Sequence, residues 1–263
     1  MSATGTLPFG VSKKKSESRT IMRNSSSRQG GAQYNNGGQR LIQLSASTLS
    51  LFKECPRCFW LQLKMGIHRP QTIFPSLPGG MDSVIKIYFD QFRGTKIGLP
   101  PELRGKVDGK LLDDQALLNE WRVRTGGLRY FHKELNTKLM GLLDDCLVDQ
   151  GAYMPLDYKT RGWAPKEDTS NFYEHQVDIY EWLLKENGYE TKGLAYLVYY
   201  HPIVVREGGL VQFEITTKKM QTDVHRARKL FEEAAMLLTT AKAPKAHSAC
   251  TFCSWGAHQE EYT

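Results

Sequence analysis

Two Cys-x-x-Cys pairs constrain the fold of this chain more than any other feature of its sequence. Cys55 and Cys58 form the first pair, and Cys250 and Cys253 form the second pair, 195 positions further on. The N-terminus lacks the apolar segment of a secretion signal, so we do not expect a disulfide framework. Four thiolates suit an iron–sulfur cluster or a Zn²⁺ ion, and either would staple the two chain ends together. The alternatives are a redox motif or chance spacing.

Two apolar segments on either side of a turn predict a β-hairpin. The first segment runs over residues 138–148 and the second over residues 153–159, with Asp149-Gln150-Gly151 between them. Both segments have the length and composition of strands, and the turn residues are typical of a hairpin. We therefore expect the two strands to pair side by side.

An acid-x-Lys triplet, Asp157-Tyr158-Lys159, ends the second strand of this hairpin. Side chains alternate between the two faces of a strand, so Asp157 and Lys159 are expected to point the same way. Asp144 is expected on the preceding strand, across the hairpin. Two carboxylates and an ammonium suit Mg²⁺ or Mn²⁺, which prefer oxygen ligands. The triplets at 108–110 and 190–192 are expected to be a turn and a helix-to-strand loop, so only the middle triplet has this context.

The rest of the chain alternates between helical and strand-like patterns. Ser47 is the expected N-cap of one helix that carries Leu49, Phe52 and Trp60, and residues 70–80 are expected to form a loop. Further helices are expected over 81–93, 173–187 and 220–240, and strands over 193–200 and 210–215. This order predicts an α/β fold with a mixed central β-sheet flanked by helices.

The first 40 residues differ in composition from the rest of the chain. They hold seven basic residues and one acidic residue, so they carry +6 of the net charge of +7. Few large apolar residues occur among them, and we expect a disordered basic tail, with an organellar transit peptide as the alternative. Residues 41–263 are then the folded domain. No stretch reaches the roughly 18 apolar residues of a membrane helix, so no membrane partner is expected and the expected location is cytoplasmic.

The two motif-bearing segments resemble a known family of nucleases. Gly141-Leu142-Leu143-Asp144, followed by Pro155-Leu156-Asp157-Tyr158-Lys159-Thr160, resembles the core motif of the RecB-like nucleases of the PD-(D/E)XK superfamily. Gln176 and Tyr180 are four residues apart on a predicted helix and match the Gln-x-x-x-Tyr motif of that family.

The resemblance implies a restriction-endonuclease-like core, with Asp144 and Asp157 as ligands of a divalent metal ion. It implies catalytic roles for these acids and for Lys159, and assisting roles beside DNA for Gln176 and Tyr180. For the last two residues the alternative is a half-buried helix face.

The closest resemblance is to the CRISPR-associated RecB-like exonucleases, from which the chain departs in two places. Those enzymes carry a metal-ligating His after a Gly on an early helix, whereas residues 79–84 contain no His. Asp82 is the candidate substitute, and the alternative is an acid that interacts with the helix macrodipole. The family holds a [4Fe–4S] cluster with one early and three late cysteines. Here the split is two and two, so Zn²⁺ remains the alternative.

The sequence thus favours a Mg²⁺- or Mn²⁺-dependent deoxyribonuclease, either an exonuclease or an end-trimming enzyme. The resemblance implies a role in CRISPR adaptation or in DNA repair and recombination, with DNA and the other proteins of those pathways as partners. A second hypothesis is a catalytically inactive DNA-binding or scaffolding member of the same fold, which the missing His favours. A third is an unrelated metal-stapled binding protein whose acids lie on the surface.

Overall fold

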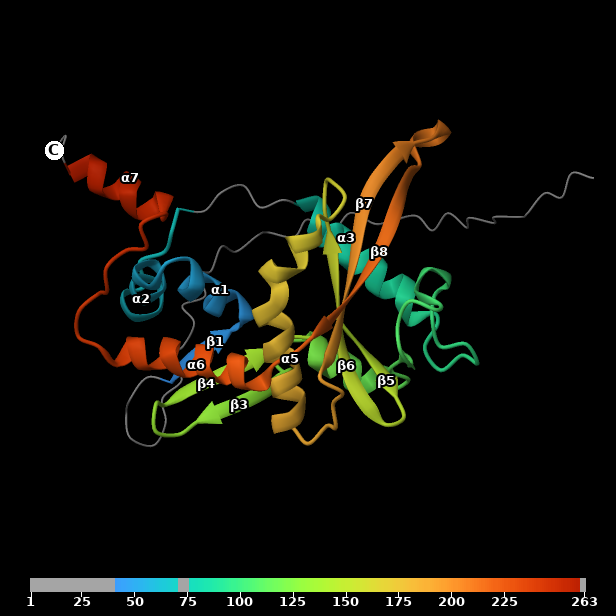
Figure 1. Ribbon diagram of the computed structural model, residues 1–263, viewed down its shortest axis with the longest axis horizontal. Coiled ribbons are helices and arrows are strands. Elements are labelled where there is room, and N and C mark those ends of the chain that lie inside the picture. Colours follow the sequence, from blue (N-terminus) through green and yellow to red (C-terminus); the bar gives the residue numbers. More distant parts are fainter. Residues whose placement is uncertain (1–40, 71–75, 261–263) are drawn as a thin grey trace, which may run out of the picture. The chain divides into compact units, whose positions relative to one another are not determined.

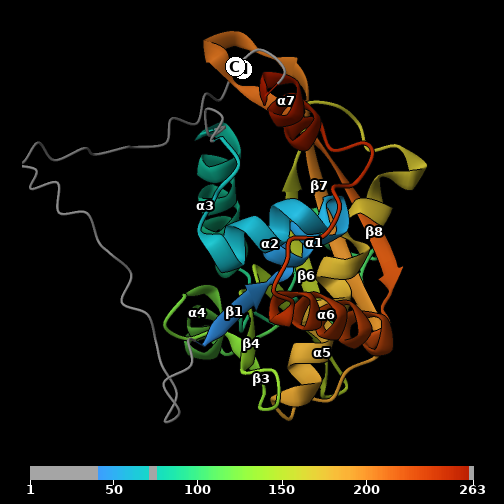
Figure 2. The same ribbon diagram turned by 90° about the vertical axis from the view of Figure 1, so that its left-hand side faces the viewer.

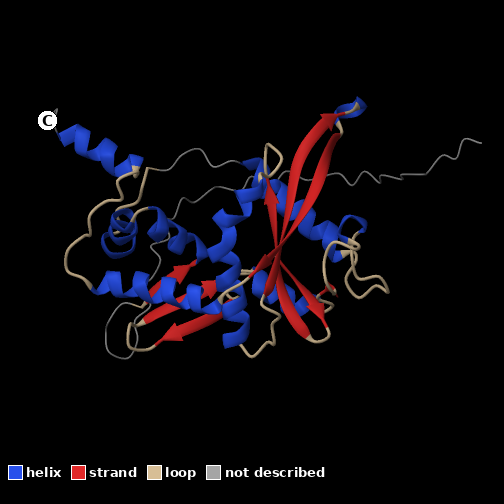
Figure 3. Cartoon of the chain, in the orientation of Figure 1, coloured by secondary structure: helices blue, strands red, loops and turns tan. Residues whose placement is uncertain are grey.

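The described part of the chain has the mixed α/β fold that the sequence predicts. The computed structural model describes residues 41–70 and 76–260, and the predicted tail of residues 1–40 lies outside the described residues. The strands form a five-stranded sheet in the order β2-β5-β6-β7-β8 and a three-stranded sheet in the order β1-β4-β3. Helices flank both sheets (Figures 1 and 3). Within these residues, no helix combines the length and apolar character that crossing a membrane requires.

The five-stranded sheet contains the predicted hairpin, which is confirmed. β5 (Asp145–Asp149) pairs antiparallel with β6 (Ala152–Thr160). Gln150 and Gly151 between them both have positive φ, which is the turn geometry that matches the twist of the flanking strands. β6 pairs in parallel with β7, so the sheet is mixed. The other strands of this sheet are β2 (Lys110–Leu111), β7 (Leu194–Val205) and β8 (Val211–Gln221).

The predicted strand over residues 138–148 is two strands that belong to different sheets. β4 (Thr137–Gly141) pairs with β1 (Ile42–Ser45) and β3 (Leu128–His132). The change of sheet occurs where a helix approaches closely: a Cβ atom at Gly141 would lie 2.6 Å from Cδ1 of Leu183. The prediction of one continuous strand was therefore wrong, and Asp144 lies in the link immediately before β5.

The first predicted helix is also two helices. α1 (Ala46–Glu54) and α2 (Pro56–Met65) meet at Cys55, whose backbone is extended. Proline disfavours helical geometry at the residue before it and has no N–H to continue the helix, which explains the break. The N-cap of α1 is Ser45, which accepts a hydrogen bond from the backbone N–H of Thr48, so the assignment of Ser47 as the cap was wrong.

Helices α3 and α5 cover opposite faces of the five-stranded sheet (Figures 1 and 2). α3 (Ser76–Asp90) begins five residues earlier and ends three residues earlier than the predicted helix over 81–93. The loop expected at 70–80 is therefore helical from Ser76, and residues 71–75 lie outside the described part. Phe89 of α3 packs against the ring of Tyr158 at 4.8 Å between centroids. On the other face, α5 (Glu174–Glu186) packs Val177 against β7.

The other helices complete the described part of the chain. They are η1 (Pro101–Leu103), α4 (Gln115–Arg122), η2 (Glu167–Tyr173), η3 (Glu207–Gly209), α6 (Val224–Thr239) and α7 (Thr251–Glu260). α6 packs against α5 and lies within the range 220–240 that the sequence predicts as helical. The sequence did not predict β1, β2 and β3.

A buried carboxylate ties α3, α4, β5 and β6 together. Asp145 is fully buried, and its carboxylate contacts the guanidinium groups of Arg93 and Arg122 and accepts a hydrogen bond from the hydroxyl of Tyr158. Asp90 pairs with both arginines at 2.9 Å. Two acids thus balance two cations inside the fold, and each charge has a partner.

We expect Asp145→Asn to lower the free energy of unfolding by about 3–5 kcal/mol, because it leaves the two buried guanidinium groups with Asp90 as their one remaining counter-ion. Asp149→Asn, on the same strand, is the matched control, since Asp149 pairs with Lys192 where both side chains are 29% exposed. That change should cost less than about 1 kcal/mol. Urea unfolding followed by circular dichroism measures both, and equal losses would contradict the role given to Asp145.

Candidate active site

Asp157, Lys159, Gln176 and Tyr180 form one hydrogen-bonded network between β6 and α5. The carboxylate of Asp157 is almost completely buried and forms an ion pair with the ammonium of Lys159. The side-chain amide of Gln176 donates to Oδ1 of Asp157 at 2.9 Å and to the hydroxyl of Tyr180 at 2.8 Å. Its carbonyl oxygen accepts a hydrogen bond from Nζ of Lys159 at 3.0 Å. The four residues singled out from the sequence therefore contact one another.

Local periodicity explains this arrangement. Asp157 and Lys159 are two residues apart on β6 and point to the same face of the sheet, toward α5. Gln176 and Tyr180 are four residues apart on α5 and lie on the helix face that meets β6. Tyr158, between the two site residues of the strand, faces α3 instead and contacts Asp145.

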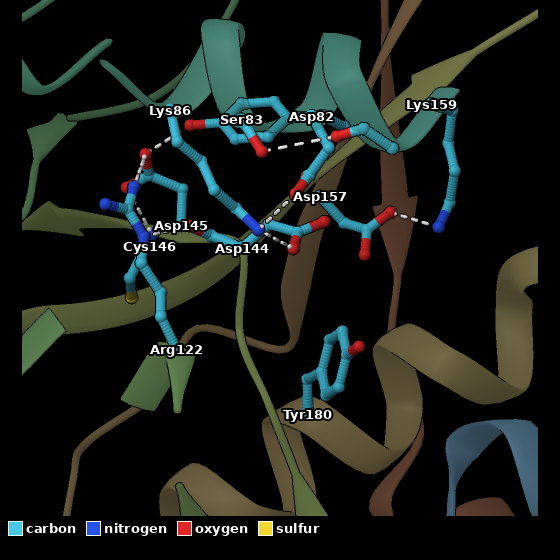
Figure 4. A network of polar contacts seen from close by, with 12 residues as sticks. Asp82, Ser83, Lys86, Arg122, Asp144, Asp145, Cys146, Asp157, Lys159 and Tyr180 are labelled. Atoms are coloured by element: carbon cyan, nitrogen blue, oxygen red, sulfur yellow. Dashed lines mark hydrogen bonds and ion pairs between the residues drawn. The ribbon is translucent and has the colours of Figure 1, made fainter. Parts of the chain in front are cut away.

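Asp144 completes a pair of facing carboxylates with Asp157 (Figure 4). Burial raises the pKa of Asp157 to about 7, and the neighbouring carboxylate of Asp144 adds to this, although the ammonium of Lys159 opposes it. Two carboxylates this close disfavour each other's charge unless a proton or a cation lies between them. The donor set is oxygen only, so these residues fit a divalent ion such as Mg²⁺ or Mn²⁺.

Lys86, which was not singled out from the sequence, links Asp82 to this site. Nζ of Lys86 lies 2.8 Å from Oδ2 of Asp82 and 2.8 Å from Oδ1 of Asp144 (Figure 4). Burial lowers the pKa of Lys86, but the carboxylates of Asp144 and Asp82 outweigh burial and raise it overall. The available signal was the spacing of four residues between Asp82 and Lys86 on a predicted helix, which places them on one face.

Tyr173 and His175 also lie at the site and were not singled out from the sequence. Nζ of Lys159 lies 4.5 Å from the centre of the Tyr173 ring, a cation–π contact. Nε2 of His175 lies 2.6 Å from Oγ of Ser50 on α1. Burial and the charges of Lys53 and Lys159 lower the pKa of His175 to about 4, so it is neutral near pH 7.

A cavity of about 790 Å³ adjoins this network. Gln176 and Tyr180 line it, together with residues of α1, of the link after β4 and of the end of η2. Lys53 and Arg124 contribute positive charge, and Tyr173 contributes an aromatic side chain. Cations and aromatic faces are the groups that bind the phosphates and bases of a nucleic-acid strand.

The four paired cysteines converge at a second site. Sγ of Cys58 lies 3.5 Å from Sγ of Cys253 and 3.6 Å from Sγ of Cys250, and Sγ of Cys55 lies 3.8 Å from that of Cys253. All four sulfur atoms lie within 4.8 Å of one another. The pairs sit at the starts of α2 and α7, while Cys146 is buried elsewhere in β5.

These cysteines can bind a metal ion. Burial raises the pKa of Cys55, but backbone N–H groups of Cys58 and His247 outweigh burial and lower it to about 6. Burial and the neighbouring thiols raise the pKa of Cys253. A bound cation would neutralise thiolates that are held this close together.

The family model described as the PD-(D/E)XK nuclease superfamily matches residues 91–257, which is more than half of the sequence. No curated protein matches the chain. The matched range contains Asp144, Asp157 and Lys159, whereas Asp82 and the first cysteine pair precede it.

We expect Mn²⁺ binding at the carboxylates to weaken as the pH falls below 7. The raised pKa means that Asp157 is protonated below about pH 7, and the ion must displace that proton. Affinity should fall about tenfold per pH unit toward pH 5 and level off above about pH 8. Calorimetric titration in buffers of different ionisation enthalpy would detect the released proton. Asp157→Asn should release none, and a flat affinity from about pH 8 to 6 would contradict the assignment.

Proposed function

The chain belongs to the PD-(D/E)XK nuclease superfamily, and we propose that it is a Mg²⁺- or Mn²⁺-dependent deoxyribonuclease whose catalytic residues include Asp144, Asp157 and Lys159. The observation that carries this proposal is the Asp157–Lys159–Gln176–Tyr180 network facing Asp144. Family membership argues against the hypothesis of an unrelated binding protein with acids on its surface, and Asp157 is 1% exposed.

In this proposal the acids hold the metal ion and the lysine acts on the substrate. A divalent ion bound by Asp144 and Asp157 supplies Lewis-acid activation of the phosphodiester and of water. Lys159, between Asp157 and Gln176, holds an ammonium at the edge of the ion site. That ammonium is suited to orient the attacking water or to stabilise the charge that develops on the phosphate.

Gln176 and Tyr180 are assigned positioning roles. The Gln176 amide contacts Asp157 and Lys159 at once, so it fixes the direction of the carboxylate relative to the ammonium. The Tyr180 hydroxyl accepts from the same amide and fixes its orientation in turn. Both residues also line the cavity, which supports assigning them contacts with the DNA strand.

The finer assignments rest on the resemblance to RecB-like and CRISPR-associated nucleases. They are removal of nucleotides from DNA ends, a role in CRISPR adaptation or in DNA repair and recombination, and partner proteins from those pathways. The proposed nuclease domain spans residues 41–263, because α1 and α2 contribute Ser50 and the first cysteine pair to it.

We expect the purified protein to degrade end-labelled DNA when Mg²⁺ or Mn²⁺ is present, and Lys159→Ala to slow this at least about 100-fold. Single- and double-stranded substrates labelled at either end would give strand preference and polarity.

Lys192→Ala is the matched control, because Lys192 ends another acid-x-Lys triplet and pairs with Asp149 away from this network. Its rate should remain close to that of the unchanged protein. An absence of cleavage by the unchanged protein, with DNA binding retained, would favour the inactive DNA-binding alternative.

For the cysteine site, the sulfur distances favour Zn²⁺ over an iron–sulfur cluster. A tetrahedral zinc site with bonds of about 2.3 Å places its sulfurs roughly 3.8 Å apart. Three of the sulfur pairs, at 3.5, 3.6 and 3.8 Å, match this spacing, and all four sulfurs lie within 4.8 Å of one another. A cluster would hold the thiolates further apart, because its own iron and sulfide atoms lie between them. The zinc ion would staple α2 to α7 and contribute folding free energy.

We expect about one zinc ion per chain by elemental analysis, with no visible absorption band from iron and sulfide. Cys58→Ser should lose the zinc and lower the thermal midpoint, because it removes a ligand of the staple. Cys146→Ala is the control, since Cys146 is a buried thiol outside the cluster and its loss should leave the zinc in place. Stoichiometric iron and acid-labile sulfide in the anaerobically purified protein would overturn the zinc assignment.

A further inference from the structure

Lys86 lies between Asp144, an acid of the proposed metal centre, and Asp82. Its ammonium lies 2.8 Å from an oxygen of Asp82 and 2.8 Å from an oxygen of Asp144. The side chain is only 21% exposed, and the Asp144 side chain is 24% exposed. Asp82 lies one helical turn before Lys86, whereas Asp144 comes from the link before β5, so the ammonium joins two separate elements.

The surrounding structure holds this ammonium in place. Ile85 and Phe89, on either side of Lys86 in α3, are buried against the five-stranded sheet. On the other side, the backbone carbonyl of Asp144 accepts a hydrogen bond from Nε of Arg122 at 2.8 Å. Neither the helix nor the link can move away without breaking buried contacts.

The charges of the site indicate how many ions it takes. Three carboxylates, those of Asp82, Asp144 and Asp157, face two ammonium groups, those of Lys86 and Lys159. One divalent ion leaves the group at about one positive charge, which a DNA phosphate neutralises. A second divalent ion would raise the charge to about +3. If Asp82 and Asp144 held it, it would lie beside the ammonium of Lys86, which contacts the same two carboxylates, and the two cations would repel each other strongly.

We propose that Lys86 is a resident cation that takes the place of a second metal ion, so that the centre binds a single divalent ion at Asp144 and Asp157. Asp82 then serves as the counter-ion of Lys86 and becomes a metal ligand only when that lysine is removed. This inference rests on the proposed metal-dependent function of the same site.

An ordinary helix-surface ion pair is the simpler explanation, and another lysine shows how such a pair differs. Lys185 lies four residues after Glu181 on α5, at 3.6 Å, and its side chain is 46% exposed. It contacts one acid of its own helix. Lys86 is less exposed, its contacts are shorter, and its second acid comes from a different part of the fold.

The test is the number of Mn²⁺ ions that the full chain binds, measured by calorimetry and by electron paramagnetic resonance of free Mn²⁺. The protein keeps its cysteine-bound metal throughout. The unchanged protein should bind one Mn²⁺, and Lys86→Met should bind two. The second ion should bind Lys86→Met at least about tenfold more tightly than any second ion binds the unchanged protein. Lys86→Arg, which keeps the charge, and Lys185→Met, the matched control, should each bind one. Lys86→Gln repeats the test if Lys86→Met does not fold.

Adding Asp82→Asn to Lys86→Met should abolish the second ion, whereas Asp82→Asn alone should change the affinity for the first ion less than about threefold. Two ions in the unchanged protein, or one ion in Lys86→Met, would overturn the proposal. Because the readout is stoichiometry, its outcome is separate from that of the cleavage assay. A protein that binds ions as expected but does not cut DNA keeps this inference and loses the proposed function. A protein that cuts DNA but binds the same number of Mn²⁺ ions with and without Lys86 keeps the proposed function and loses this inference.

Discussion

The buried ion cluster around Asp145 is the interaction on which the rest of the site depends. A carboxylate without exposed surface must have counter-charges, and Arg93 and Arg122 supply them from just after α3 and from the end of α4. The cluster therefore fixes both helices against the start of β5. Arg122 also donates to the backbone carbonyl of Asp144, so the same cluster sets the position of the acid that precedes Asp145 in the chain.

On the opposite face of β6, the site combines charges that are costly to bury. Asp157 is buried beside Asp144, and the ion pair with Lys159 and the amide of Gln176 offset only part of the cost. The raised pKa of Asp157 reflects the part of this cost that these contacts do not offset. A divalent cation would relieve this repulsion, which supports the proposal of a metal site at these carboxylates.

The cysteine site is distant in sequence from the acids but is connected to them through α1. Cys55 ends α1 and begins α2, and Ser50, one turn earlier in α1, contacts His175 at 2.6 Å. His175 precedes Gln176 in α5. A metal staple between α2 and α7 would therefore also hold α1 against the helix that carries the Gln-x-x-x-Tyr pair, and along the cavity beside it.

The sequence by itself determined the features that depend on local periodicity. Asp157 and Lys159 share a face because a strand repeats every two residues, and Gln176 and Tyr180 share one because a helix repeats every 3.6. Other features required the tertiary structure. The division of residues 138–148 between two sheets follows from the packing of α5 at Gly141, and the bridge from Asp82 to Asp144 follows from the docking of α3. Residues 62 positions apart carry no local pattern that predicts their contact, because only the packing of buried faces brings them together.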